Sequence, residues 1–202
     1  MSIRIALLSA VAFSALAVAG GLLVPANAED KKMTKSEMSG EKTVMVGGAA
    51  MFPSKNIIEN AVNSKDHTTL VAAVKAAGLV ETLEGKGPFT VFAPTNAAFG
   101  KLPAGTIDTL LKPENKEKLA TILKCHVVAA DAMSSAIGKM IKDDKGAHPV
   151  KTVGGCMLTA KMNGDTITLT DEKGDVATVT IADVKQSNGV IHVIDTLMLP
   201  KA

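Results

Sequence analysis

The stretch from Gly87 to Phe99 constrains the fold more than any other part of this chain. It reads Gly-Pro-Phe-Thr-Val-Phe-Ala-Pro-Thr-Asn-Ala-Ala-Phe. Residues 89–92 are β-branched or aromatic and place apolar groups on both faces, which is typical of a strand that is covered on both sides. Pro94 fixes one φ angle, and Thr95 or Asn96 offers a side-chain oxygen to the free N–H groups of a helix beginning near Ala97. The stretch therefore predicts a central strand that leads directly into a helix.

The periodicity of the chain changes at Cys125. Before it, apolar residues recur at helical spacing in three segments, 56–62, 68–77 and 113–123, and Gly78 ends the second of them. A short helix near 133–141 follows Cys125, and the other segments after it alternate as strands do. The expected strands are 125–128, 149–153, 156–162, 166–170, 177–184 and 189–199. Asn163-Gly164 and Asn188-Gly189 are hairpin signals between them. Helices with one strand first, and strands afterwards, predict an α+β fold.

Three segments resemble the motifs of the fasciclin (FAS1) domain family. The stretch 87–99 looks like the first signature box, and 188–200 (Asn-Gly-Val-Ile-His-Val-Ile-Asp-Thr-Leu-Met-Leu-Pro) looks like the second. Between them, His126-Val127-Val128 is similar to the family's Tyr-His segment, although Cys125 stands where the family commonly has tyrosine. The likeness covers roughly residues 48–202. It implies a compact β-sandwich-like core with several helices packed against it, and association at the cell surface.

The N-terminus has the features of a secretory signal peptide. Arg4 precedes an apolar run from Ile5 to Val24, and Pro25-Ala-Asn-Ala28 supplies a small-x-small cleavage site. An uncleaved membrane anchor is the alternative, because the run is nearly long enough to span a bilayer. Gly20-Gly21, Pro25 and the cleavage site favour removal of residues 1–28. We therefore expect an exported protein, periplasmic or extracellular, without stable membrane insertion.

Residues 29–47 are expected to form a flexible polar lead-in to a FAS1 domain at 48–202. The segment is rich in lysine, lacks sustained periodicity and contains Ser39-Gly40 and Gly47-Gly48. Four methionines, at positions 33, 38, 45 and 51, could offer thioether ligands to Cu(I). Their spacing is irregular and no His or Cys joins them, so the prediction is that they bind no metal.

Composition argues against several classes of partner. The whole chain has 22 Lys and Arg against 20 Asp and Glu, and it lacks Trp and Tyr. Arg4 is the only arginine, so the chain after cleavage is nearly neutral and has no guanidinium groups. A nearly neutral chain exerts little attraction on nucleic acid or anionic lipid, and few aromatic rings are present for stacking on bases. Nucleic acid is therefore not an expected partner.

Cys125 and Cys156 are expected to form a disulfide, because two cysteines in an exported chain most simply pair. Two buried free thiols are the alternative. Closing a loop of about 30 residues would constrain the unfolded chain by about 3–4 kcal/mol in the entropy model. The prediction is therefore a stabilising cross-link, which labelling of free thiols in the unfolded, unreduced protein would refute.

No arrangement of residues predicts catalysis or a cofactor. Neighbours on a strand point to opposite faces, so His126 is poorly placed to activate Cys125. His126, His192, Asp183 and Asp195 lack a compact ligand spacing such as His-x-His. Phosphate-binding loops and nucleophile elbows are also missing from the sequence. The expectation is a protein without enzymatic activity, cofactor or metal.

The resemblance favours a binding module for adhesion to a cell-surface or matrix protein or polysaccharide. Thr95, Asn96 and His126 are the candidate partner-binding residues. The alternative for Thr95 and Asn96 is that they only cap a helix, and His126, among apolar residues, is more often part of a core. A second functional hypothesis is a soluble periplasmic protein that holds a small ligand or metal, or serves as a stress or redox accessory. Exposed strand edges permit weak self-association.

Overall fold

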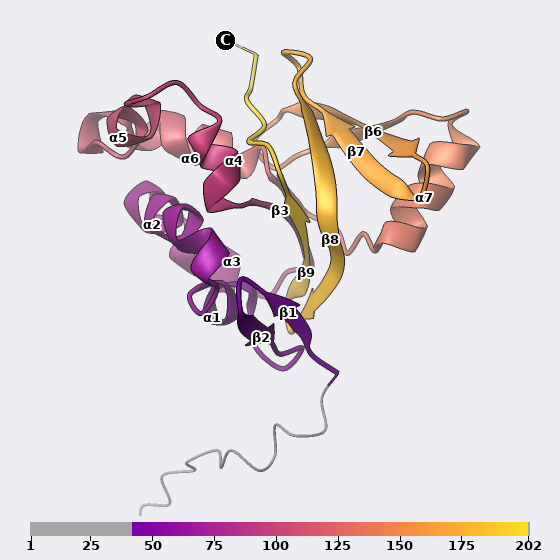
Figure 1. Ribbon diagram of the computed structural model, residues 1–202, viewed down its shortest axis with the longest axis horizontal. Helices are drawn as coiled ribbons and strands as arrows, with labels where there is room; N and C mark the ends of the chain where they lie inside the picture. Colours follow the sequence, from indigo (N-terminus) through magenta and orange to yellow (C-terminus); the bar gives the residue numbers. More distant parts are fainter. Residues whose placement is uncertain (1–41, 202) are drawn as a thin grey trace, which may run out of the picture. The chain divides into compact units, whose positions relative to one another are not determined.

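Strand β3 (Phe89–Pro94) lies inside the main sheet of the computed structural model, which describes residues 42–201 (Figure 1). Five of its six residues are buried, as its apolar pattern predicts. It is followed at once by helix α4 (Asn96–Gly100), whose first turn is capped by the Thr95 side chain. The central strand and the helix that follows it are therefore confirmed. The predicted signal peptide lies outside the described residues.

The main sheet has seven strands in the order β4-β3-β9-β8-β7-β6-β5 and is nearly closed. The other six are β4 (Val127–Val128), β5 (His148–Lys151), β6 (Met157–Asn163), β7 (Thr166–Thr170), β8 (Val176–Gln186) and β9 (Gly189–Ile194). Every neighbouring pair in this sheet is antiparallel except β3 with β9, which is parallel. Segments about a hundred positions apart in the sequence thus form the centre of the sheet.

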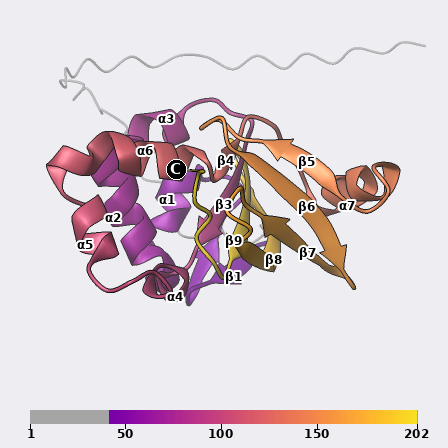
Figure 2. The same ribbon diagram turned by 90° about the horizontal axis from the view of Figure 1, so that it is seen from above.

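Helices cover the sheet unequally. Residues 42–201 contain α1 (Ile57–Ala61), η2 (Lys65–His67), α2 (Thr68–Ala77), α3 (Val80–Glu84), α4, α5 (Thr106–Leu110), η3 (Pro113–Asn115), α6 (Lys116–Lys124) and α7 (Ser134–Asp143). Helices α1–α6 lie to one side of β3 and β9, whereas α7 lies with β5–β7 on the other side (Figures 1 and 2). This arrangement confirms the expected α+β class. No helix in the described part of the chain is long and apolar enough to cross a membrane.

The apolar residues divide into two clusters that correspond to these two sides. The larger cluster joins the helices α1–α6 to the sheet through residues such as Leu70, Leu123 and Ile191. The smaller cluster packs α7 against β6–β8, with Ile137, Leu158 and Leu169 among its members. Alternation along β6–β8 produces this packing, because every second side chain faces inward. Phe92 and Ile194 of the central strands belong to the smaller cluster, so these strands carry buried side chains toward both clusters.

A two-stranded hairpin precedes the helices. β1 (Val44–Val46) pairs with β2 (Ala49–Met51), so regular structure begins inside the segment for which a flexible lead-in is expected. The turn between the strands is Gly47-Gly48, and both glycines have positive φ angles, 57° and 77°. Two central residues with positive φ match the twist of a short hairpin, and glycine adopts this conformation without strain. Val46 and Met51 are buried and hold the hairpin on the larger cluster.

Gly189 is a site where a single methyl group should be strongly destabilising. It lies opposite Phe89 in the parallel pair β3–β9, and a Cβ atom there would overlap the Phe89 carbonyl oxygen. Because backbone in a central pair cannot move aside, we expect Gly189→Ala to lower the free energy of unfolding by about 3 kcal/mol or more. Gly100→Ala is the matched control, since a Cβ at Gly100 would meet no atom within 4 Å. Equal urea-denaturation midpoints for the two variants would contradict this packing.

Candidate functional site

The carboxyl ends of β3 and β9 bring two polar segments together. Pro94 is opposite Ile194, and the Thr95 N–H donates to the Ile194 carbonyl oxygen at 3.2 Å. Residues 95–96 and 195–196 therefore leave the sheet side by side. Loops at the carboxyl ends of parallel strands are a common place for ligand binding in α/β sheets. We call Thr95, Asn96, Lys101, Asp195 and Thr196 the carboxyl-end surface.

A charged pair lies at the open part of the carboxyl-end surface. The Lys101 ammonium is 3.4 Å from the Asp195 carboxylate and 3.0 Å from the Thr196 hydroxyl oxygen. The two charged side chains are 54% and 40% exposed. Burial acts to raise the pKa of Asp195, but hydrogen bonds from the Thr178 N–H and the Thr196 hydroxyl, together with Lys101, lower the pKa overall. Asp195 is therefore ionised at neutral pH, and the surface presents one charge of each sign.

Thr95 and Asn96 are half-buried, and their polar atoms already have partners within the chain. The Thr95 hydroxyl accepts from the Ala98 N–H at 3.2 Å, which is the capping contact that the sequence predicts. The Asn96 amide oxygen accepts from the Thr69 N–H at 2.9 Å, and its NH₂ group donates to the Lys65 carbonyl oxygen at 2.9 Å. Asn96 thus joins the start of α4 to the start of α2. Both residues shape the carboxyl-end surface by fixing its backbone.

His126 lies in the core and is 2% exposed. Its Nδ1 is 2.8 Å from the Ile122 carbonyl oxygen, and its Nε2 accepts from the Met198 N–H at 3.0 Å. This pattern requires a neutral ring with the proton on Nδ1. Burial lowers the pKa of His126 to about 4, although the Ile122 carbonyl and Asp171 oppose that shift. In this position His126 ties α6 to the C-terminal segment, and its ring does not reach the surface.

Cys125 and Cys156 form a disulfide, with their Cα atoms 5.4 Å apart. Cys125 is the C-cap of α6, rather than the first residue of a strand as the sequence suggested, and Cys156 immediately precedes β6. Nearby, the Val153 N–H donates to the Val127 carbonyl oxygen at 2.7 Å. The disulfide and this hydrogen bond join the β4 end of the sheet to the segment that follows β5. They therefore hold the nearly closed sheet together where its two edge strands approach.

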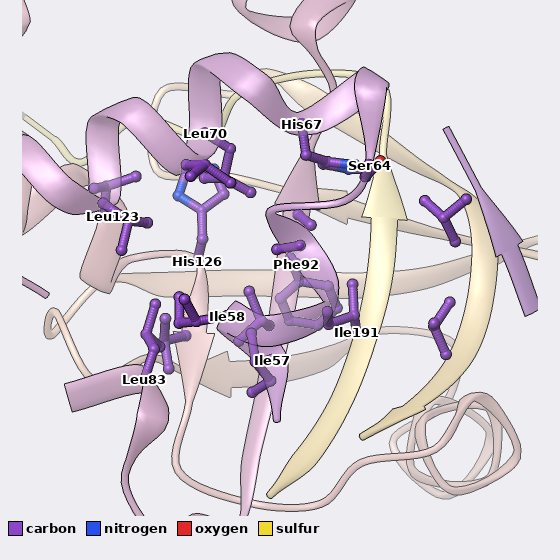
Figure 3. A pocket seen from close by; sticks show the side chains of 18 of the residues that line it. Ile57, Ile58, Ser64, His67, Leu70, Leu83, Phe92, Leu123, His126 and Ile191 are labelled. Atoms are coloured by element: carbon purple, nitrogen blue, oxygen red, sulfur yellow. Dashed lines mark hydrogen bonds between the residues drawn. The ribbon is translucent and has the colours of Figure 1, made fainter. Parts of the chain in front are cut away.

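An apolar cavity of about 50 Å³ lies between the helices and the sheet. Among the residues drawn around it in Figure 3 are Ile57, Ile58, Leu70, Leu83, Leu123 and Ile191, which belong to α1, α2, α3, α6 and β9. The polar lining residues are Ser64, His67 and His126. Because polar groups are few, the cavity suits apolar atoms better than water, which needs several hydrogen-bond partners.

His67 is the one described residue with a buried side-chain nitrogen that lacks a hydrogen-bond partner. Its Nδ1 lies 2.8 Å from the Ser64 hydroxyl oxygen, whereas its Nε2 has no partner among residues 42–201. Burial lowers the pKa of His67, and the nearby Ala93 carbonyl and Asp66 carboxylate oppose that shift. Neither group forms a hydrogen bond with Nε2. The ring is therefore neutral at pH 7 and lines the cavity with one unused polar atom.

Several residues of these sites were not identified from the sequence. Lys101, Ser64 and His67 lie outside the three motifs, and Thr196 lies inside the second box but was not singled out. Lys101 comes close to Asp195 and Thr196 only when β3 and β9 pair. The available signal was that the apolar, strand-like part of each box is followed by a polar pair, Thr95-Asn96 in the first and Asp195-Thr196 in the second. In the part of the chain that the structure describes, no three His, Cys, Asp or Glu side chains gather in a group that could hold a metal ion.

Comparison with known proteins identifies the fold. Residues 65–200 match the fasciclin domain. Protein sll1483 of Synechocystis is 48% identical over 160 residues, which cover 79% of this chain and 82% of that protein. The cell surface glycolipoprotein MPB83 of Mycobacterium bovis is 31% identical over 198 residues, covering 88% of this chain and 82% of that one.

A solved structure shares the architecture. It is the FAS1 domain pair from the insect cell adhesion molecule Fasciclin I, with a TM-score of 0.65 and 16% identity. The match covers 79% of this chain and 58% of the solved chain, so this chain corresponds to part of that pair. At this identity the likeness shows the fold alone. Together with the domain match over residues 65–200, it establishes that this chain belongs to the fasciclin (FAS1) domain family.

Proposed function

We propose that this protein is an exported, non-enzymatic FAS1 module that mediates adhesion by binding a cell-surface or matrix protein or polysaccharide. FAS1 domains are generally non-catalytic binding modules. Two similar proteins are named as a cell surface glycolipoprotein and a cell adhesion molecule. The predicted signal peptide and the Cys125–Cys156 disulfide favour an oxidising location, which is the periplasm or the exterior of the cell.

The observation that carries the proposal is the carboxyl-end surface. The backbone at Thr95 and Asn96 is fixed by hydrogen bonds, and Lys101 and Asp195 stand exposed beside it. A preorganised surface loses little conformational entropy on binding. Its two charges and its hydroxyl groups suit a polar partner surface. His126 contributes to this surface only indirectly, by anchoring the segment that follows Thr196.

A charge reversal tests this surface. Lys101→Glu places two carboxylates together and should weaken binding of the purified protein to its native cell surface on the order of tenfold. The melting temperature should change little, because an exposed ion pair contributes about 0–1 kcal/mol. Lys112→Glu is the matched control, since Lys112 is 57% exposed and faces Glu114 at 3.9 Å. Equal binding of both variants and the unmodified protein would exclude the carboxyl-end surface.

The cavity supports a second candidate function, the holding of a small apolar ligand with one polar atom. Such a ligand would fill the space between α1, α2 and β9 and give His67 Nε2 the partner that it lacks. Gas chromatography and mass spectrometry of an organic extract, from protein isolated from its native compartment, would test this function. A stoichiometric small molecule supports the second candidate. Its absence, with binding still sensitive to Lys101→Glu, supports adhesion.

A further inference from the structure

The sequence contains two Asn-Gly pairs, and the structure places them in very different environments. Asn163-Gly164 is at the tip of the β6–β7 hairpin, where both residues are exposed. Asn188-Gly189 connects β8 to β9 beside the larger apolar cluster. Chemically the two dipeptides are the same, so any difference in their reactivity comes from the fold.

At the exposed pair, the reacting groups are free. Neither the Asn163 side chain nor the Gly164 N–H makes a hydrogen bond within residues 42–201. The hairpin is closed by the pairing of Asn163 with Thr166, and Gly164 has a φ angle of 62°. Glycine has no Cβ, so its peptide nitrogen is unhindered. Rotation about the Cα–C and Cα–Cβ bonds of Asn163, at the last pair of the ladder, brings that nitrogen toward the Asn163 side chain. Approach to about 3–3.5 Å of the Asn163 Cγ atom is what the attack requires.

At Asn188-Gly189, the corresponding side-chain amide and peptide backbone are fixed by hydrogen bonds and strand pairing. The Asn188 NH₂ group donates to the carbonyl oxygens of Leu83 at 2.7 Å and Gly85 at 2.8 Å. Its amide oxygen accepts from the Ile57 N–H at 3.1 Å. Gly189 belongs to β9 and is paired with both Gln186 and Phe89. Bringing the Gly189 nitrogen to the Asn188 Cγ atom would break these contacts, so the fold keeps the reacting atoms apart.

From this contrast we infer that Asn163 is a site of spontaneous deamidation in the folded protein, and that Asn188 is protected. The Gly164 peptide nitrogen loses its proton to solvent and attacks Asn163 Cγ; a C–N bond forms, and the side-chain nitrogen leaves as ammonia. Water then opens the cyclic imide at either carbonyl group, which yields aspartate or isoaspartate. The net change consumes one water molecule, releases one ammonia and involves no oxidation or reduction.

The product changes the tip of the hairpin. A new carboxylate appears beside Asp165, so two acidic groups become neighbours in the turn. Isoaspartate also adds one atom to the backbone at the residue that pairs with Thr166, which disturbs the end of the β6–β7 ladder. The modification therefore alters both charge and register at one exposed site and leaves the core intact.

Peptide mapping tests the inference directly. Cleavage after lysine yields peptides 162–173 and 186–201, each with a single asparagine. After incubation of the folded protein at 37 °C and mildly alkaline pH, deamidation in the first peptide should exceed that in the second on the order of tenfold or more. Protein incubated in denaturant should deamidate at both positions at similar rates. Asn163→Gln should abolish the product at position 163 on this time scale, because attack on the longer side chain has to close a six-membered imide, which forms much more slowly than the five-membered one.

Two outcomes would overturn the inference. Comparable deamidation at Asn163 and Asn188 in the folded protein would show that the hydrogen bonds of Asn188 give no protection. Intact Asn163 in the folded protein, with reaction at both positions in denaturant, would show that the hairpin prevents the attack. Either result is independent of the adhesion proposal, because the carboxyl-end surface contains neither asparagine.

Discussion

Removal of the Cys125–Cys156 disulfide should lower the free energy of unfolding by about 3–4 kcal/mol. The bond closes a loop of 31 residues, and the entropy model assigns a stabilisation of this size to a loop of this length. The effect should be large because the bond and the Val153–Val127 hydrogen bond join the two edge regions of the sheet. The measurement is urea denaturation of the Cys125→Ala/Cys156→Ala variant against the unmodified protein.

The chemical reduction of the bond supplies the control. The unmodified protein in reductant should unfold at the same urea concentration as the double variant, since both lack the cross-link. The double variant itself should be insensitive to reductant. A double variant as stable as the oxidised protein would mean that the hydrogen bonds near β4 and β5 suffice to close the sheet, contrary to the proposed contribution of the disulfide.

Mild acid should also destabilise the protein strongly. Burial lowers the pKa values of His67, His126 and His192 below their ordinary value of about 6.5. At pH values between the ordinary histidine pKa and the lower pKa of the folded state, the unfolded chain binds more protons than the folded chain. The free energy of unfolding is therefore highest above pH 6.5 and falls as the pH drops below it. For His126, with a pKa of about 4, the loss reaches about 3 kcal/mol by pH 4.

The histidines and the carboxylates affect stability over different pH ranges. Asp195 and Glu172 have lowered pKa values, so their contribution is lost only as the pH falls below the ordinary carboxylate range near 4. Denaturation curves between pH 7.5 and 5 thus report the histidines. His126→Gln should reduce the slope of stability against pH, although it lowers stability at pH 7. His148→Gln is the control, because His148 is partly exposed and bonded to Asp144. An unchanged slope of stability against pH in His126→Gln would contradict the contribution of His126 to the acid sensitivity.

Local sequence signals identified the elements whose structure depends on adjacent residues. The strand and helix of residues 89–100 were predicted because prolines, β-branched residues and a capping threonine act within a few positions of one another. The hairpin at Asn163-Gly164 also follows from its sequence. Its central residues are Gly164 and Asp165, because Asn163 pairs with Thr166 and remains in the strand.

Structural features that depend on contacts between distant residues could not be predicted from the sequence. Residues 195–199 were expected to continue the last strand, but β9 ends at Ile194. The N–H groups beyond it donate to side chains elsewhere in the fold: Met198 to His126 at 3.0 Å and Leu199 to Asp171 at 2.8 Å. No local pattern encodes these partners, and the apolar sequence of the segment resembles that of a strand.

The candidate site was only partly predicted for the same reason, because some of its contacts join segments that are far apart in the sequence. Thr95 and Asn96 were identified by their position after a strand, and the capping role of Thr95 follows from that position. The contacts of Asn96 with Thr69 and Lys65 join distant segments and were not predicted. Lys101 and Asp195 become neighbours through the parallel pairing of β3 with β9, which sequence periodicity cannot indicate. His126 was a candidate for partner contact because its segment resembles a family motif, whereas its ring is buried by α6 and the C-terminal segment.

The most direct test of the adhesion proposal is cross-linking of the protein on intact cells. An amine-reactive reagent would capture protein partners through lysine, and mild periodate oxidation would let surface sugars react with the same groups. The proposal predicts that one cell-surface or matrix species is captured reproducibly, through Lys101 and the exposed Lys65 close to Asn96, and not through Lys112. Capture of only a second copy of the chain, or equal reaction at Lys112, would contradict it.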